Sequence, residues 1–449
     1  MSKTGRTSTR ELLHLAWPVL IAQLAMMGSA VIDTAMAGRL SAVDLAAVGI
    51  ASSIAATVLM SLISVLLALM PIIAHLYGAG RHEEIGHEIH QSIWISFALA
   101  LIAVLLLRFP EPFIAISELQ PDVEIKVRAY LAASSWGVPG VIALRLFLGL
   151  TTGIGQPRPA MIFNLLSLAL KFPLNAVFMY GLLGMPELGG PGCAVASAVD
   201  ATLIAVLAWG WCLRNSDYAA FRLHRKFVAP EWKAIMDFLR LGVPIGVTFV
   251  ADVTAFTLMA LFIARLGPVI SGAHQIAANL AAFAFMVPLA LGNATSVLVG
   301  QALGANQSER ARQICWEGLR LGMAIAVTLC LLFYFGASHI ATLYTTDENV
   351  QAVAIPLIVL VGIYHLGDAM QVITVNALRG YKKSVVPMIV YAVGLWTVAL
   401  GGGYMLGLTD VFGAAHGAAG FWIAGIAGIG MVGIAMTIYL DALSRARSP

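Results

Sequence analysis

The first part of this chain repeats in its second half at an offset of 226 residues and without a gap. Residues 11–83 align with residues 237–309, and 17 of the 73 aligned positions are identical, where this composition gives about 8% by chance. The identical positions include Pro18 with Pro244, Arg39-Leu40 with Arg265-Leu266, and Gly78-Ala79 with Gly304-Ala305. In membrane proteins, internal repeats are typical of secondary transporters, whose binding sites lie between or within the repeats. The repeat therefore indicates transport.

The composition indicates a membrane protein. Hydrophobic residues make up 60% of the chain and charged residues 11%, against about 45–50% and about 25% in soluble domains. Because a membrane-spanning helix needs about 20 apolar residues, we expect twelve spans, at about 12–36, 44–76, 90–110, 126–150, 158–182, 191–213, 236–264, 269–300, 316–336, 349–376, 385–408 and 416–440. The sequence does not alternate with period two, so a β-barrel is excluded. We predict an all-α integral membrane protein with twelve transmembrane helices.

The basic residues predict the orientation of these spans. With both termini in the cytoplasm, 19 of the 26 Lys and Arg residues fall on the cytoplasmic side, 5 fall outside and 2 fall within spans. Six spans separate the repeats, so both copies enter the membrane in the same direction. We predict two parallel-repeat six-helix bundles, at 1–213 and 236–449, joined by a cytoplasmic linker at 214–235.

The remaining composition argues against other partners. The net charge of +3 comes from basic residues at membrane boundaries and is not a signal for nucleic acid. The four cysteines show no metal-binding or disulfide spacing. We therefore expect no cofactor, the lipid bilayer as surroundings, and a monomer.

Two acidic residues predict an ion site in the second lobe. Asp252 and Asp368 are 12 and 11 residues from Arg240 and Arg379, which puts both about 16–18 Å above the inner membrane boundary. A charge inside a span costs roughly 2.5–3.5 kcal/mol on insertion scales, and we expect no base in the core of this lobe. Two such carboxylates must share a proton or hold a cation. We predict a coupling-ion site for Na⁺ or H⁺, with Tyr364 one helical turn before Asp368 as a further oxygen ligand.

The first lobe carries a base as well as acids. Lys171 and Asp200 lie on consecutive spans, both about 20 Å above the inner boundary, so we expect them to form a structural ion pair. Asp33 lies nearer the outer surface, within reach of Asn175 or Lys171, and is a candidate cation or substrate site. For each buried acid, the alternative is an interhelical hydrogen bond without a role in transport.

His274 and Gln275 are the other polar residues singled out in the second lobe. They lie opposite Val48-Gly49 of the first copy. Either they bind substrate or they brace a helix, and the sequence favours neither.

Several motifs carry a family resemblance. They are Ala-His-Gln-Ile-Ala at 273–277, Val-Gly-Gln-Ala-Leu-Gly-Ala at 299–305, Leu-Tyr-Gly-Ala-Gly at 76–80 and Pro-Leu-Asn at 173–175. With twelve spans in two copies, the chain resembles the multidrug and toxic compound extrusion (MATE) transporters, and most closely their bacterial NorM-like branch. The resemblance covers nearly the whole chain.

This resemblance implies a V-shaped pair of six-helix bundles in the bacterial inner membrane. It also implies export of amphipathic cationic drugs and dyes, coupled to inward flow of Na⁺ or H⁺. The family's ion site matches Asp252, Asp368 and Tyr364, and its first-lobe acid and companion match Asp33 and Asn175. One position departs, because residue 171 is commonly Asn in the family and is Lys here, which argues against a first-lobe Na⁺ site.

Other functions fit the sequence less well. A lipid-linked saccharide flippase of the same superfold needs a cationic groove for phosphates, but the predicted membrane core carries four acids against two bases. In an intramembrane aspartyl enzyme, Asp252 and Asp368 would form the catalytic pair, but the internal repeat argues against it. A channel would not need gradient-coupled, saturable flux.

Overall fold

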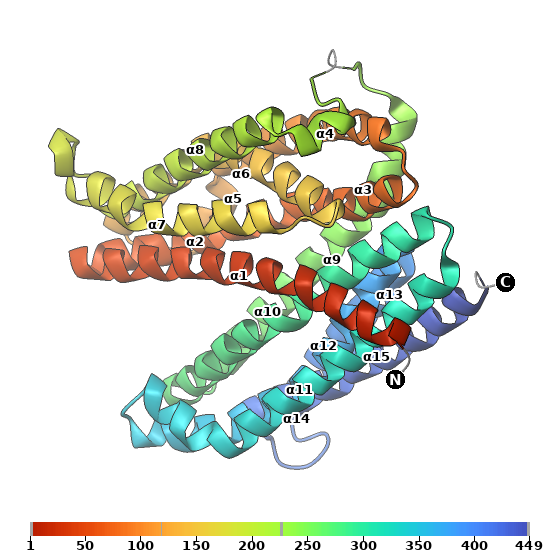
Figure 1. Cartoon of the computed structure of the whole chain (residues 1–449). Helices are drawn as coiled ribbons and strands as arrows, with labels where there is room; N and C mark the ends of the chain where they lie inside the picture. Colours follow the sequence, from red (N-terminus) through yellow and green to blue (C-terminus); the bar gives the residue numbers. More distant parts are fainter. Residues whose placement is uncertain (1–2, 118, 225–227, 447–449) are drawn as a thin grey trace. The chain divides into compact units, whose positions relative to one another are not determined.

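The computed structural model describes residues 3–117, 119–224 and 228–446, and these residues contain helices and no strand (Figure 1). Twelve helical segments in them are long and apolar enough to cross a membrane. This confirms the predicted all-α class and the predicted number of spans.

The N-terminal half contains six of the twelve segments. They are α1 (Lys3–Leu40), the series α2 (Ala42–Ile63), η1 (Ser64–Ala68) and α3 (Leu69–Gly78), α4 (His82–Arg108), α6 (Pro121–Gly153), α7 (Arg158–Tyr180) and α8 (Gly192–Arg214). The shorter helices α5 (Glu111–Ser117), η2 (Leu182–Gly184) and η3 (Ser216–Phe221) lie in the connections.

The C-terminal half contains the other six. They are α9 (Trp232–Ala264), α10 (Pro268–Gly304), α11 (Ser308–Tyr344), α12 (Glu348–Gly380), the series α13 (Val385–Val393), η4 (Gly394–Gly401) and α14 (Gly402–Leu408), and α15 (Ala418–Ala446). The middle of the α13–α14 series is a π-helical stretch, η4. Such stretches are rare and occur often at functional sites.

The helix ends follow from local sequence. The Ser41 side chain accepts a hydrogen bond of 2.9 Å from the backbone N–H of Asp44 and caps α2. Asp347 caps α12 in the same way, at 2.9 Å from the N–H of Asn349. These side chains satisfy backbone donors that a helix start leaves unpaired. Gly181, with φ of 70°, ends α7 in the left-handed conformation that glycine adopts without strain.

The chain forms two compact units, and both repeat copies start in one unit and end in the other. The N-terminal unit is Ile21–Gly246, and the C-terminal unit is Val247–Pro449 together with the chain up to Leu20. The boundaries at Leu20 and Gly246 are again 226 residues apart, and each follows a helix-interior proline, Pro18 or Pro244, by two residues. The units therefore differ from the predicted lobes in the N-terminal parts of α1 and α9: α1 up to Leu20 belongs to the C-terminal unit, and α9 up to Gly246 belongs to the N-terminal unit.

Contacts within each unit hold these helix beginnings. In the C-terminal unit, Thr9 of α1 donates a hydrogen bond of 3.0 Å to Glu317 of α11, and Arg310 lies 3.1 Å from Glu11. In the N-terminal unit, Gly242 of α9 packs so closely on η1 that a Cβ there would lie 2.5 Å from the carbonyl oxygen of Val65. A glycine allows this approach because it has no side chain.

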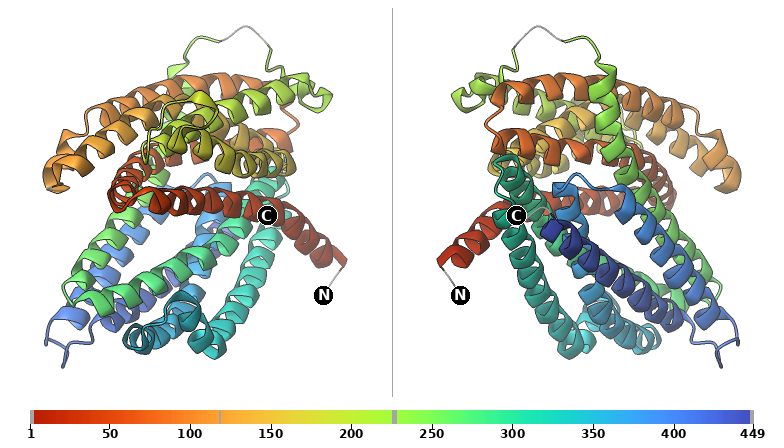
Figure 2. Two further views of the ribbon diagram at one scale, coloured as in Figure 1. Left: turned by 90° about the vertical axis from the view of Figure 1, so that its left-hand side faces the viewer. Right: turned by 90° about the vertical axis from the view of Figure 1, so that its right-hand side faces the viewer.

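The described parts of the connection between α8 and α9, which are η3 and residues 228–231, contact α4 (Figure 2). The Gln91 amide donates to the carbonyl of Ala229 at 3.0 Å and accepts from the N–H of Glu231 at 2.9 Å. Trp94 donates to the carbonyl of Val228 at 3.0 Å. Residues 225–227 of the predicted linker lie outside the described residues.

We predict that the close packing of α6 on α8 stabilises the N-terminal unit. A Cβ at Gly140 would lie 2.7 Å from the backbone nitrogen of Thr202. Gly140→Ala should therefore lower the apparent melting temperature of the purified protein, because overpacking costs about 1–3 kcal/mol. Gly210→Ala, on α8 with open space around it, is the control and should leave the melting temperature unchanged or slightly raised. Equal melting temperatures for the two variants would contradict the packing argument.

Candidate functional site

Asp252 of the C-terminal unit is held by a tyrosine of another helix. The hydroxyl of Tyr391, on α13, donates a hydrogen bond to its carboxylate. One residue earlier on α9, the carbonyl of Ala251 accepts a hydrogen bond of 3.1 Å from the indole of Trp396 in η4. The end of α13 and the π-helical stretch are thus fixed against α9 at the level of the acid.

Asp368 lies on α12 and is only 7% exposed to solvent. It interacts electrostatically with Asp252, and both acids interact with Tyr364. The imidazole Nδ1 of His365 lies 3.9 Å from the Asp368 carboxylate, and this ring is charged only when protonated. In the described part of the chain, no Lys or Arg forms an ion pair with either acid.

A pocket adjoins Asp252 and Tyr391. Its polar lining also includes Thr248, Gln371, Asn376 and Arg379. From the sequence, Arg379 was expected at the membrane boundary, and no base was expected in this core. That expectation was wrong, because Arg379 is 9% exposed and donates to the Asn376 amide oxygen at 3.2 Å.

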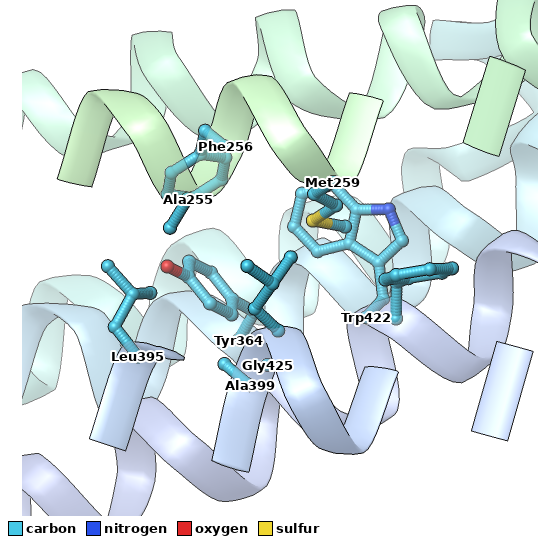
Figure 3. A pocket seen from close by; sticks show the side chains of 10 residues that line it. Ala255, Phe256, Met259, Tyr364, Leu395, Ala399, Trp422 and Gly425 are labelled. Carbon is cyan, nitrogen blue, oxygen red and sulfur yellow. The ribbon is translucent and has the colours of Figure 1, made fainter. Parts of the chain in front are cut away.

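A second, mainly apolar pocket is lined in part by Tyr364. Its lining comes from α9, α12, the α13–α14 series and α15. Figure 3 shows Phe256 and Met259 of α9 facing the rings of Tyr364 and Trp422. The two rings meet edge to face, with centroids 5.5 Å apart. Such a pocket can hold flat apolar groups of varied shape, since Met and aromatic side chains adapt to them.

His274 stands behind this pocket and Gln275 does not. The His274 ring is buried, and its centroid lies 5.9 Å from that of Trp422. Gln275, the next residue on α10, is exposed. The His274 ring therefore contacts Trp422, which lines the pocket, and Gln275 does not line the pocket.

The N-terminal unit contains a separate cluster of charged and polar side chains. Asp33 of α1 accepts a hydrogen bond of 2.7 Å from the Asn175 amide and lies 3.0 Å from the Lys171 ammonium. Lys171 and Asn175 are one turn apart on α7 and both are buried. Lys171 also donates to the hydroxyl of Ser197 on α8. Asp33 thus reaches both of the partners that the sequence analysis named for it.

The predicted ion pair between Lys171 and Asp200 does not form. Asp200 instead accepts a hydrogen bond from Ser167, one turn before Lys171 on α7. The Lys171 ammonium lies instead beside Asp33 of α1, the other acid that was expected within its reach. Asp200 stays within electrostatic reach of the ammonium.

Three residues of these sites were missed from the sequence: Tyr391, Ser197 and Arg379. Tyr391 and Ser197 are uncharged, and their importance depends on which helices are neighbours. A polar residue inside an apolar span was the available signal, but it does not identify the partner.

In the described residues, no group of three or more His, Cys, Asp or Glu comes together as a metal site.

The family model MatE matches the chain twice, at residues 18–177 and 244–405. The chain belongs to the MatE family. The second match begins at Pro244 and the first at Pro18, the paired prolines of the repeat.

Relatives match over most of the chain. A probable multidrug resistance protein NorM of Aromatoleum aromaticum is 36% identical over 400 residues, covering 89% of this chain and 86% of the relative. The multidrug resistance protein MdtK of Pectobacterium atrosepticum is 35% identical and covers 98% of this chain and 96% of its own. These relatives confirm the resemblance to the NorM-like branch.

Solved structures show the same fold. The crystal structure of the Vibrio cholerae MATE transporter VcmN in the bent form superposes with a TM-score of 0.88, at 18% identity and 99% coverage of both chains. The eukaryotic MATE transporter AtDTX14 also gives 0.88, at 16% identity and 99% coverage of both chains. The predicted MATE fold is therefore confirmed.

We predict that the Tyr391 hydroxyl stabilises the C-terminal unit through Asp252. A hydrogen bond to a charged group contributes about 1.5–3 kcal/mol, so Tyr391→Phe should lower the apparent melting temperature by a few degrees. Tyr404→Phe is the control, since that residue is exposed and packs edge-on against Phe262. A shift of equal size in both variants would mean that the bond to Asp252 adds nothing.

Proposed function

We propose that this protein is a secondary active multidrug exporter, which moves amphipathic organic cations out of the cell in exchange for inward Na⁺ or H⁺. The observation that carries the proposal is the pair Asp252 and Asp368, two acids of one membrane-embedded core that form no ion pair with a Lys or Arg among the described residues. Membership of the MatE family and relatives named as multidrug resistance proteins support the direction and the kind of substrate.

The coupling ion binds between these two acids. In a low-dielectric core two neighbouring carboxylates repel, and a proton or a monovalent cation relieves the repulsion. Tyr364 and Tyr391 supply hydroxyl oxygens to the same group. Arg379 lines the adjoining cavity but bonds to Asn376, so the acids still need the ion.

Each unit, taken by itself, offers the substrate one kind of contact. Asp33, with Asn175 beside it, attracts the cationic group in the N-terminal unit. In the C-terminal unit, the pocket of Phe256, Met259 and Trp422 accepts aromatic rings. Attraction by a carboxylate and contact with adaptable walls select for charge and apolarity but not for one shape, which gives broad specificity.

The membrane potential drives this exchange when more positive charge enters with the ions than leaves with the drug, and a one-for-one exchange is driven by the ion gradient alone. Each net elementary charge that crosses 100 mV releases about 2.3 kcal/mol, which supports a concentration gradient of roughly fiftyfold. The basic residues favour cytoplasmic termini, and we propose a monomer in the bacterial inner membrane.

Efflux of ethidium from cells tests the acid pair. Asp368→Asn should reduce efflux at least tenfold, because the amide cannot bind the ion as a carboxylate does. Asp410→Asn, in an exposed loop, is the control and should export like the wild type. If Asp368→Asn keeps both full efflux and the ion dependence, the acid pair has no part in coupling.

Proteoliposomes identify the coupling ion. Ethidium-loaded vesicles should release dye faster under an imposed Na⁺ gradient or under a pH gradient alone, and the effective gradient names the ion. Asp252→Asn should abolish the acceleration and leave passive leakage unchanged. Equal release with and without both gradients would contradict antiport.

A further inference from the structure

The buried charges of the N-terminal unit do not balance. Asp33 and Asp200 are two acids, and Lys171 is the one base that interacts with both. Lys171 is only 4% exposed, and the two acids are also largely buried. With all three groups charged, the cluster carries one net negative charge in a low-dielectric region, where an uncompensated charge is costly.

Two oxygens of this cluster are buried without a hydrogen bond. They are Oδ1 of Asn175 and Oδ1 of Asp200. The first belongs to the residue that bonds Asp33, and the second belongs to the acid that only Ser167 bonds. Buried acceptors without a donor are rare in proteins and call for an explanation. Here both point to a missing donor or cation.

Lys171 stands between the two acids. Its ammonium lies 3.0 Å from Asp33 and bonds Ser197, whose own hydroxyl donates to the carbonyl of Cys193 at 2.7 Å. Ser197 and Asp200 are three residues apart on α8, so they share one helix face. The Lys171 side chain can therefore exchange Asp33 for Asp200 by rotating about its own bonds, while α7 and α8 stay in place.

We propose that Lys171 is a resident counter-cation which the transported substrate displaces from Asp33, and that the displaced ammonium then pairs with Asp200. The substrate at this site is a monovalent organic cation whose ammonium-like group can also donate to Asn175. Binding changes the net charge of the cluster from −1 to zero. This inference rests on the proposed function, because it concerns the substrate that the exporter moves.

The arrangement determines selectivity as well as affinity. A substrate must replace the contact of Lys171 with Asp33, which requires a positive charge. A neutral compound cannot displace the ammonium. A dication would leave the cluster positive, with three cationic charges against two acids. Lys171 therefore selects for a single positive charge.

The remaining ionisable groups facing Asp33 are Tyr130 of α6 and Cys193 of α8.

A double-mutant cycle tests the exchange. Ethidium affinity is measured by fluorescence anisotropy on the purified full-length protein for the wild type, Lys171→Met, Asp200→Asn and the double variant. Asp200→Asn should weaken binding about tenfold when Lys171 is present, because the displaced ammonium has no acid to receive it. In the Lys171→Met background the same change should weaken binding less than threefold. Lys171→Met alone should strengthen binding about tenfold.

Further variants keep the test decisive. Lys171→Gln replaces Lys171→Met if the latter does not fold, since the amide can still bond Ser197 without a charge. Asp33→Asn should weaken binding at least tenfold. Equal effects of Asp200→Asn in both backgrounds, or no effect of Asp33→Asn, would overturn the exchange while leaving export intact. Failure of the wild type to bind or export ethidium would overturn the proposed function and this inference together.

Discussion

The low dielectric constant of the membrane interior is the constraint on which the sites of this protein depend, because every buried charge there requires a compensating group. The four acids within the predicted spans receive different ones. Asp33 has an ammonium, Asp200 a serine hydroxyl and Asp252 a tyrosine hydroxyl. Asp368 forms no ion pair with a Lys or Arg of the described residues and has a histidine 3.9 Å away. The least compensated acid lies beside another acid, and we place the mobile ion there.

The repeat provides one framework for two different sites. Each copy begins in one unit, and its chain enters the other unit just after the second residue that follows its proline. The acids do not follow the repeat: the position equivalent to Asp33 is Met259, and the position equivalent to Asp252 is Met26. The copies therefore share helix packing and differ in charge. Such divergence suits a transporter in which one unit binds the coupling ion and the other selects the substrate.

Much of this account could be predicted from the sequence, because lipid imposes strong rules on composition. Apolar length fixed the twelve spans, and charge within spans identified Asp33, Asp252 and Asp368. Cross-helix partners could not be predicted, because residue depth does not specify which way a side chain turns. Lys171 therefore pairs with Asp33 and not with Asp200, and Tyr391 was missed. Arg379 was assigned to the surface because it ends a helix, although neighbouring helices cover it.

Exchange of the ion for the drug is the central claim, and ion release on drug binding measures it most directly. Ethidium is added to the purified protein in weakly buffered solution, and released protons and ²²Na⁺ are counted together. We expect about one monovalent ion released per drug bound by the wild type, and none by the Asp252→Asn, Asp368→Asn double variant. Drug binding by the wild type without release of either ion would contradict the account.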